Sequence, residues 1–117
     1  MIPQLIETYG VPSLLVGFFV WRFIRFRRVK AEIPALVEKG GVVIDVRSRS
    51  EFAAGSNPRS INIPLDELAG SMGQFSVEQP IVLCCASGTR SGMAVSQFKQ
   101  RGFKNVVNAG PWKNTVT

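Results

Sequence analysis

The sequence predicts a small α/β domain with a parallel sheet of about four to five strands flanked by helices, preceded by one N-terminal transmembrane or interfacial helix. Short apolar runs alternate with segments whose apolar residues recur at helical spacing. Those runs are apolar on both faces, as the strands of a parallel sheet covered on both sides are. The first 30 residues differ, because an uncharged stretch at residues 11–21 is followed by a cluster of basic residues. We therefore divide the chain into an N-terminal membrane anchor with a basic juxtamembrane segment, residues 1–30, and an α/β domain, residues 31–117.

Local signals predict each element of the domain. Runs of Val, Ile and Leu too short for a helix predict buried strands. Helices are predicted where apolar residues lie three or four positions apart, with turn and capping residues at their ends. In chain order we expect a helix at residues 31–39 ended by Gly40 and a left-handed Gly41, a strand at 42–44, a helix at 49–54 capped by Ser48 or Ser50, a strand at 60–63, a helix at 66–71, a strand at 81–85, a helix at 91–101, a strand at 106–107 and a turn at 108–112.

The net charge of +6 is concentrated near the N-terminus. Residues 1–30 hold five basic residues and one acidic residue, whereas residues 31–117 hold nine and seven. A nucleic-acid surface needs its basic residues spread over a folded face, so this distribution argues against nucleic acid as a partner. Basic residues that directly follow an apolar stretch favour membrane lipid as the partner instead.

The N-terminal segment predicts a membrane helix with a defined orientation. Its uncharged core is shorter than the ~20 residues that a spanning helix needs, but Arg22 and Arg25 could extend it by reaching toward the headgroups. An amphipathic helix lying in the interface and a cleaved signal peptide are the alternatives. The basic residues after the apolar stretch predict a single-pass protein of the inner (cytoplasmic) membrane whose domain faces the cytoplasm.

The two cysteines, Cys84 and Cys85, are adjacent and cannot form a disulfide framework. The chain has no histidine and no second pair of thiols, so we expect no metal site and no cofactor. Neighbouring residues of a strand face opposite sides. If Cys85 opens into the following loop, Cys84 packs beneath it or serves as a resolving thiol.

The loop after the strand at residues 81–85 carries the chemistry that the sequence predicts. Ligands of open parallel sheets bind beyond the carboxyl ends of the strands. Backbone N–H groups of this loop, before a helix that starts near Ser91, can converge on an anion above Cys85, and Arg90 adds positive charge. Such surroundings favour the thiolate, which is the nucleophilic form. The predicted site consists of Cys85 with the binding residues Ala86, Ser87, Gly88, Thr89, Arg90 and Ser91.

Four segments in order resemble the rhodanese superfamily: VVIDVRSRSEFAAG, INIPLDEL, IVLCCASGTRSGMA and GFKNVVNAGPWKN. The resemblance covers about residues 42–114 and is similar to the small single-domain type. It implies a sulfurtransferase in which Cys85 takes sulfur from thiosulfate or a persulfide and passes it to a thiol or cyanide. It also implies that Asp45 and Arg47 form a supporting ion pair and that Glu51 is structural. The family's histidine before the Asn-Ile-Pro segment is absent here.

Two other functions fit parts of the same sequence. Counted from Cys84 to Arg90, the loop has the Cys-x5-Arg spacing of cysteine phosphatases, whereas counted from Cys85 it is one residue shorter and suits a single sulfur atom. The second alternative is a non-catalytic rhodanese module that binds a partner or senses reactive sulfur. The physiological donor and acceptor and the oligomeric state are left open by the sequence.

Overall fold

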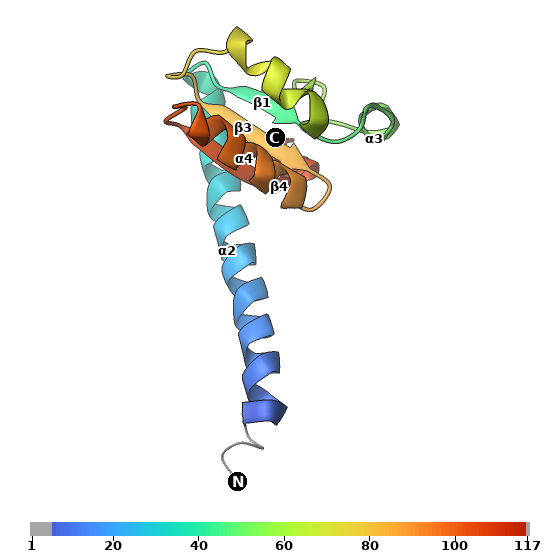
Figure 1. The fold of residues 1–117 in the computed structure, drawn as a ribbon, viewed down its shortest axis with the longest axis vertical. Helices are drawn as coiled ribbons and strands as arrows, with labels where there is room; N and C mark the ends of the chain where they lie inside the picture. The colour runs from blue at the N-terminus through green and yellow to red at the C-terminus, as the bar shows by residue number, and fades with distance from the viewer. Residues whose placement is uncertain (1–5, 117) are drawn as a thin grey trace.

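The computed structural model describes residues 6–116, in which a long N-terminal helix extends from a small α/β domain (Figure 1). The molecule measures 59 × 32 × 27 Å, and the long dimension follows that helix. The first five residues of the predicted N-terminal segment lie outside the described residues.

The domain is built on a four-stranded parallel sheet with the strand order β2-β1-β3-β4. The strands are β1 (Val42–Asp45), β2 (Ile61–Asn62), β3 (Ile81–Cys85) and β4 (Val106–Pro111). Asp45 lies opposite Cys84 on the neighbouring strand, and Cys85 lies opposite Pro111. The prediction of a small parallel sheet is confirmed, and the carboxyl ends of three strands meet where the site was expected.

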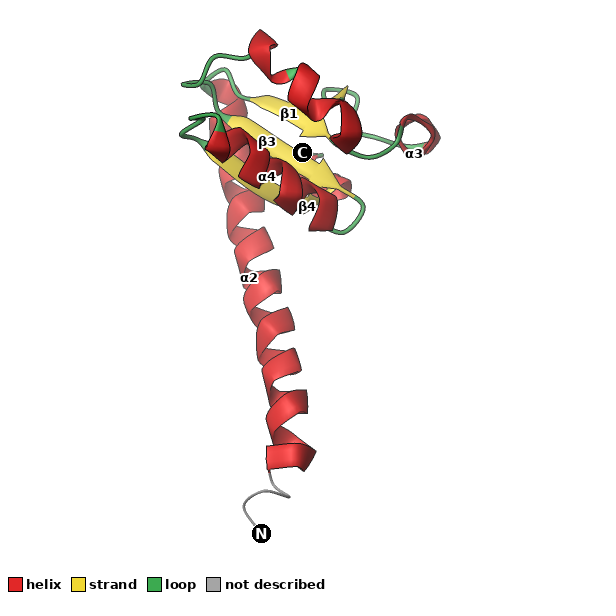
Figure 2. Ribbon diagram, viewed as in Figure 1, coloured by secondary structure: helices red, strands yellow, loops and turns green. Residues whose placement is uncertain are grey.

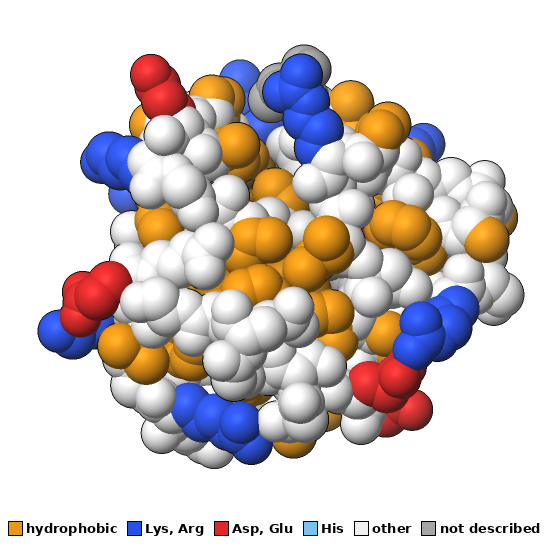
Figure 3. Space-filling view, turned by 90° about the horizontal axis from the view of Figure 1, so that it is seen from above, with side chains coloured by type: hydrophobic (Ala, Val, Ile, Leu, Met, Phe, Trp, Pro, Cys, Tyr) orange, Lys and Arg blue, Asp and Glu red, His pale blue; other side chains and the backbone are white. Residues whose placement is uncertain are grey.

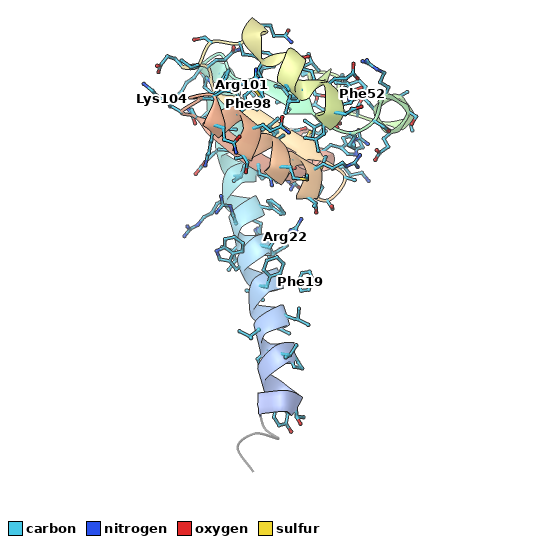
Figure 4. The ribbon with its side chains drawn as sticks, viewed as in Figure 1. Phe19, Arg22, Phe52, Phe98, Arg101 and Lys104 are labelled. Carbon is cyan, nitrogen blue, oxygen red and sulfur yellow. The ribbon has the colours of Figure 1, made fainter. Side chains whose placement is uncertain are left out.

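Helices cover both faces of the sheet, as the apolar strands predict (Figure 2). One face packs against α4 (Thr89–Gln100) and the 3₁₀ segments η2 (Leu65–Gly70) and η3 (Met72–Gln74), with Phe98 fully buried in its core. Figure 4 shows Phe98 on the α4 ribbon over the sheet. The other face packs against the C-terminal part of α2 (Val11–Glu38) and against η4 (Trp112–Thr115).

Helix α2 joins two elements that the sequence analysis treats as separate. It runs unbroken for 28 residues and includes the predicted helix at 31–39. The basic and alanine residues around the expected boundary are good helix formers, and no glycine interrupts them. The helix ends at Glu38, and Gly40, two residues further on, supplies with its φ of 91° the left-handed cap that we expected at Gly41.

The N-terminal half of α2 protrudes from the domain and exposes its apolar side chains. Leu14 is 74% exposed and Phe19 is 62% exposed. Within residues 6–116, no helix is both long and apolar enough to cross a membrane. The prediction of a spanning helix therefore finds no support in the described residues, because the basic side chains from Arg22 onward interrupt the apolar run too early.

The remaining elements differ from the expectations mainly at their ends. Helix α3 (Arg49–Ala54) has Ser48 as its N-cap, and Ser48 and Glu51 each accept a hydrogen bond from the other's backbone N–H at 3.3 Å. Strand β4 continues through the predicted turn because it pairs with the whole of β3. Seen from the end opposite to the protruding helix, apolar side chains gather at the centre of the surface and charged ones at its rim (Figure 3).

Candidate active site

The candidate site lies at the carboxyl edge of the sheet, between β3 and α4. Cys85 is the last residue of β3, and α4 begins at Thr89, so the connecting loop is three residues long. Gly88 makes this short turn with a φ of 104°, a left-handed conformation that side chains other than glycine rarely adopt. The loop therefore brings its own amides back over the Cys85 thiol.

The Cys85 sulfur is buried and held by hydrogen bonds from that loop. The backbone N–H of Gly88 donates to Sγ at 2.9 Å, and the Ser91 hydroxyl lies 3.3 Å from Sγ. Burial opposes ionisation, but hydrogen bonds from the Ser91 side chain and from the amides of Ser91, Gly88 and Ser87 outweigh it. The pKa of Cys85 is consequently lower than that of an ordinary thiol, which favours the nucleophilic thiolate.

Cys84 lies on the other face of the sheet, in the core beneath α2. It is fully buried beside Ile33, Val82 and Ala109, so the predicted packing role is confirmed. Burial, followed by the negative charge of Asp45, raises the pKa of the Cys84 thiol far above its usual value. A cysteine phosphatase would need this thiol as its nucleophile, and its position in the core argues against that alternative.

The structure places Arg90 against a carboxylate. Its guanidinium forms a two-pronged ion pair with Glu51, with Nη1–Oε1 at 2.6 Å and Nη2–Oε2 at 2.9 Å. Hydrogen bonds from Arg90, followed by the Ser48 amide, lower the pKa of Glu51 to about 2. The pair ties α4 to α3, and a contact between Arg90 and bound sulfur stays a prediction.

Asp45 and Arg47 form a buried ion pair at the end of β1. Arg47 Nε donates to both Asp45 oxygens at 2.9 and 3.0 Å and Nη2 donates to Oδ2 at 2.7 Å, and these hydrogen bonds raise the pKa of Arg47. Arg47 also donates to the Gly55 carbonyl at 2.8 Å and lies 5.1 Å from the centre of the Trp112 ring. The predicted pair is thus present, and it braces the strand end beside the loop.

Sequence reasoning missed Asn108, which clamps the loop from β4. Its Oδ1 accepts hydrogen bonds from the Ser91 hydroxyl at 2.6 Å and the Gly110 amide at 2.9 Å. Its Nδ2 donates to the Gly88 carbonyl at 2.9 Å. The available signal was a polar residue directly after the apolar Val106-Val107 pair, a weak signal because turn residues look the same.

Helix α2 also reaches the loop, through residues that were assigned to the membrane anchor. Arg22 Nη2 donates to the Ser87 carbonyl. The Phe26 ring lies so close to Gly88 that a Cβ at that position would meet its Cζ atom at 2.7 Å. No spacing rule could connect Arg22 with a loop 65 residues away.

Two open grooves border this arrangement. One, of about 620 Å³, is lined by Val46, Leu65, Glu67, Arg90 and Gln97. It lies on the face toward which Cys85 points, since Cys85 and Val46 share one core cluster. The other, of about 170 Å³, lies between α2 and the loop.

Fold and site together define an α/β protein with a buried cysteine whose thiol is hydrogen-bonded by a short loop at the carboxyl edge of a parallel sheet. Residues 29–110 match the model of the rhodanese-like domain. Because this match covers more than half of the chain, the chain belongs to the rhodanese-like domain family, and its relatives of comparable size place it with the single-domain sulfurtransferases.

Curated relatives and solved structures agree with this placement. The chain is 32% identical over 82 residues to the thiosulfate sulfurtransferase GlpE of Pseudomonas aeruginosa, covering 69% of this chain and 74% of that protein. It is 35% identical over 69 residues to the putative sulfur carrier protein YrkF of Bacillus subtilis, of which it spans only 37%, and 59% of this chain is covered. The human single-domain sulfurtransferase TSTD1 superposes with a TM-score of 0.64 at 27% identity, covering 72% of this chain and 88% of that one.

Proposed function

We propose that this protein moves sulfane sulfur from thiosulfate or a persulfide to a thiol or cyanide acceptor through a persulfide on Cys85. The Cys85 thiolate attacks the outer sulfur of thiosulfate, the new S–S bond forms as the old one breaks, and sulfite leaves with the bonding electrons. An acceptor thiolate then attacks the terminal sulfur of the persulfide. This second step returns Cys85 to the thiolate and releases the acceptor as a persulfide; with cyanide the product is thiocyanate.

One observation carries the proposal: the Cys85 sulfur is the focus of the loop's hydrogen bonds. The Gly88 amide and the Ser91 hydroxyl both lie within hydrogen-bonding distance of Sγ. Hydrogen-bond donors that point at the sulfur stabilise the negative charge of the Cys85 thiolate, and they would stabilise the charged terminal sulfur of a persulfide in the same way. The amides of residues 86–91 are the donors that we assign to the terminal sulfur.

Thiosulfate as donor is supported by the Pseudomonas relatives, which are named thiosulfate sulfurtransferases. The test is the mass of the intact protein after incubation with thiosulfate. We expect a gain of about 32 Da on Cys85, lost again when a thiol or cyanide is added. Cys85→Ser should abolish the adduct, whereas Cys84→Ser should retain it. No adduct with thiosulfate or a small-molecule persulfide would contradict the proposal and favour a binding module.

The protruding part of α2 is the segment that we assign to lipid in this proposal. Its apolar side chains are exposed around the helix, including Leu14, Phe18, Phe19 and Trp21, and a one-sided protein interface would leave most of them in water. The basic residues that follow suit the anionic headgroups of the cytoplasmic leaflet. In this arrangement the α/β domain faces the cytoplasm.

Sedimentation with vesicles of phosphatidylglycerol and phosphatidylcholine tests the lipid assignment. Binding should be lost in Phe19→Asp and retained in Val77→Asp, which changes an exposed apolar side chain of the domain. Equal binding of both variants would overturn the assignment. A periplasmic reporter fused to the carboxyl end should stay inactive in cells, and an active reporter would contradict the cytoplasmic orientation.

A further inference from the structure

The positive charges that the sequence places at the loop are already neutralised. Arg90 is held by Glu51 and Arg47 by Asp45, each through more than one hydrogen bond. A guanidinium in a two-pronged pair with a carboxylate has little charge left for a second anion. The thiosulfate dianion of the proposed reaction therefore needs another cation to receive its sulfonate group.

Arg22 of α2 is placed to be that cation. One of its Nη atoms donates to the Ser87 carbonyl, which leaves its other N–H groups for a ligand. Among the side chains that the structure describes, those of residues 8–116, the ion pairs to carboxylates are made by Arg47, Arg49, Arg90 and Lys104, and not by Arg22. Figure 4 shows Arg22 on α2 just where the helix leaves the domain.

Arg22 and Cys85 flank the same residue of the loop. The Gly88 amide donates to the Cys85 sulfur at 2.9 Å, and a Cβ built on Gly88 would lie 3.1 Å from Arg22 Nη2. Gly88 therefore lies between the two groups, and a donor whose outer sulfur meets Cys85 has to reach past this one residue for its anionic end to contact the guanidinium. Thiosulfate is a small ion, so it could contact both Cys85 and Arg22 only because a single residue separates them.

The groove between α2 and the loop has a composition that suits an oxyanion. It is an open groove of about 170 Å³, and its lining includes Trp21, Arg22, Arg25, Phe26, Gly88 and Asn108. The guanidinium of Arg22 lies 5.2 Å from the centre of the Phe26 ring, and that of Arg25 lies 5.5 Å from the centre of the Trp21 ring. Aromatic walls lower the local dielectric and so strengthen the attraction between these guanidinium groups and an anion.

We propose that Arg22, with Arg25 beside it, forms an anion subsite of the catalytic loop that binds the sulfonate end of an anionic sulfur donor. The assignment of the donor rests on the proposed function, whereas the preference of the subsite for anions does not. The N-terminal helix is then part of the active site as well as a support for the sheet.

The first test compares two alkylating reagents of nearly equal size at Cys85, anionic iodoacetate and neutral iodoacetamide, followed by mass spectrometry. The ratio of the two rates cancels any change in the reactivity of the thiol itself. Arg22→Gln should lower the iodoacetate-to-iodoacetamide ratio by about tenfold, since hydrogen bonds to charged groups are the strong ones. Arg22→Lys should recover most of the ratio because it keeps the charge.

Arg28→Gln is the matched control, because Arg28 is exposed on the same helix and its substitution removes the same charge. It should leave the ratio unchanged. If Arg22→Gln and Arg28→Gln give the same ratio as the unaltered protein, the subsite does not exist. This outcome is independent of sulfur transfer, because alkylation requires only the thiol.

The second test is the steady-state rate with thiosulfate and cyanide. Arg22→Gln should raise KM for thiosulfate by about tenfold and change kcat less, since it removes binding of the donor's distal end. An unchanged KM together with a lowered alkylation ratio would retain the anion subsite and overturn its assignment to thiosulfate. Absence of turnover in the unaltered protein would overturn the proposed function and leave the alkylation result standing.

Discussion

Asn108 accepts a hydrogen bond from the Ser91 hydroxyl at 2.6 Å, and the same hydroxyl lies 3.3 Å from the Cys85 sulfur. Ser91 has one hydroxyl hydrogen for these two neighbours. When Cys85 is a thiol, its S–H can donate to Ser91, which then donates to Asn108. When Cys85 is a thiolate, the Ser91 hydroxyl can turn toward Sγ. The Asn108 side chain on β4 is therefore linked through Ser91 to the ionisation of Cys85 on β3.

Asn108→Asp should raise the pKa of Cys85. The carboxylate keeps the acceptor for Ser91 but adds a negative charge two hydrogen bonds from Sγ, which disfavours a second negative charge there. We expect the iodoacetamide rate below the pKa to fall by about tenfold, because less of Cys85 is then thiolate. The pH dependence of that rate measures the effect. The same change at Asn105, which is exposed and directly precedes β4, should leave the pH profile unchanged.

Glu51→Gln should remove a contribution to stability that depends on pH. The pKa of Glu51 is lowered in the folded protein from its usual 4.5 to about 2, so the contribution is present above pH 4.5 and is lost as the pH falls toward 2. Urea unfolding at neutral pH should show the variant less stable than the unaltered protein, with the two converging in acid. Glu78→Gln, which breaks an exposed pair with Lys104, is the control. A difference that persists below pH 2 would show that the Arg90 pair is not its cause.

Asp45→Asn should be among the most damaging single substitutions. Asp45 is fully buried and the Arg47 side chain is only 6% exposed, so the change leaves a buried guanidinium without its counter-charge. Breaking such a pair costs about 3–5 kcal/mol of the free energy of unfolding. Chemical denaturation measures the loss. The double variant Asp45→Asn with Arg47→Met should recover part of it, and a double variant less stable than Asp45→Asn would refute this explanation.

Gly88→Ala should disturb both the loop and the packing of α2. The left-handed backbone alone costs about 1–2 kcal/mol for a residue with a side chain. Gly102→Ala is the control, because Gly102 has a φ of 89° and no atom lies within 4 Å of a Cβ added there, so this change has the backbone cost alone. Gly88→Ala adds the clash with Phe26 and should therefore lower the unfolding midpoint more than Gly102→Ala. Adding Phe26→Ala should narrow the gap, and an unchanged gap would mean that α2 does not press on the loop.

The agreement between sequence and structure is best for features that are local in the chain. The apolar run at residues 81–85 predicts a buried strand, and the helical spacing after the loop predicts the helix that follows. Alternation along β3 correctly separates Cys84 from Cys85. The sequence leaves Ser48 and Ser50 as candidates for the N-cap of α3. In the structure the N-cap is Ser48, because Glu51 lies three residues later and completes the capping box.

The hydrogen-bond and ion-pair partners of the site residues could not be predicted from local sequence patterns. Arg90 reaches Glu51 across 39 residues, and Asn108 reaches Gly88 across 20. Which of several nearby carboxylates an arginine meets depends on how the helices pack, and periodicity contains no information on that. The same holds for Arg22, which the sequence assigns to a basic segment near lipid and the fold brings to the Ser87 carbonyl.

The sequence by itself determined the order of strands and helices along the α/β domain, the loop that follows the strand at residues 81–85 and which of the two cysteines faces it, because each follows from hydrogen bonding and side-chain periodicity over a few residues. Only the tertiary structure decided which charges near the loop are paired with carboxylates, that Asn108 accepts a hydrogen bond from Ser91, and that α2 is one helix whose Arg22 donates to the Ser87 carbonyl of the loop. These are contacts between segments far apart in the chain, fixed by burying the apolar faces of α2 and α4 against one sheet.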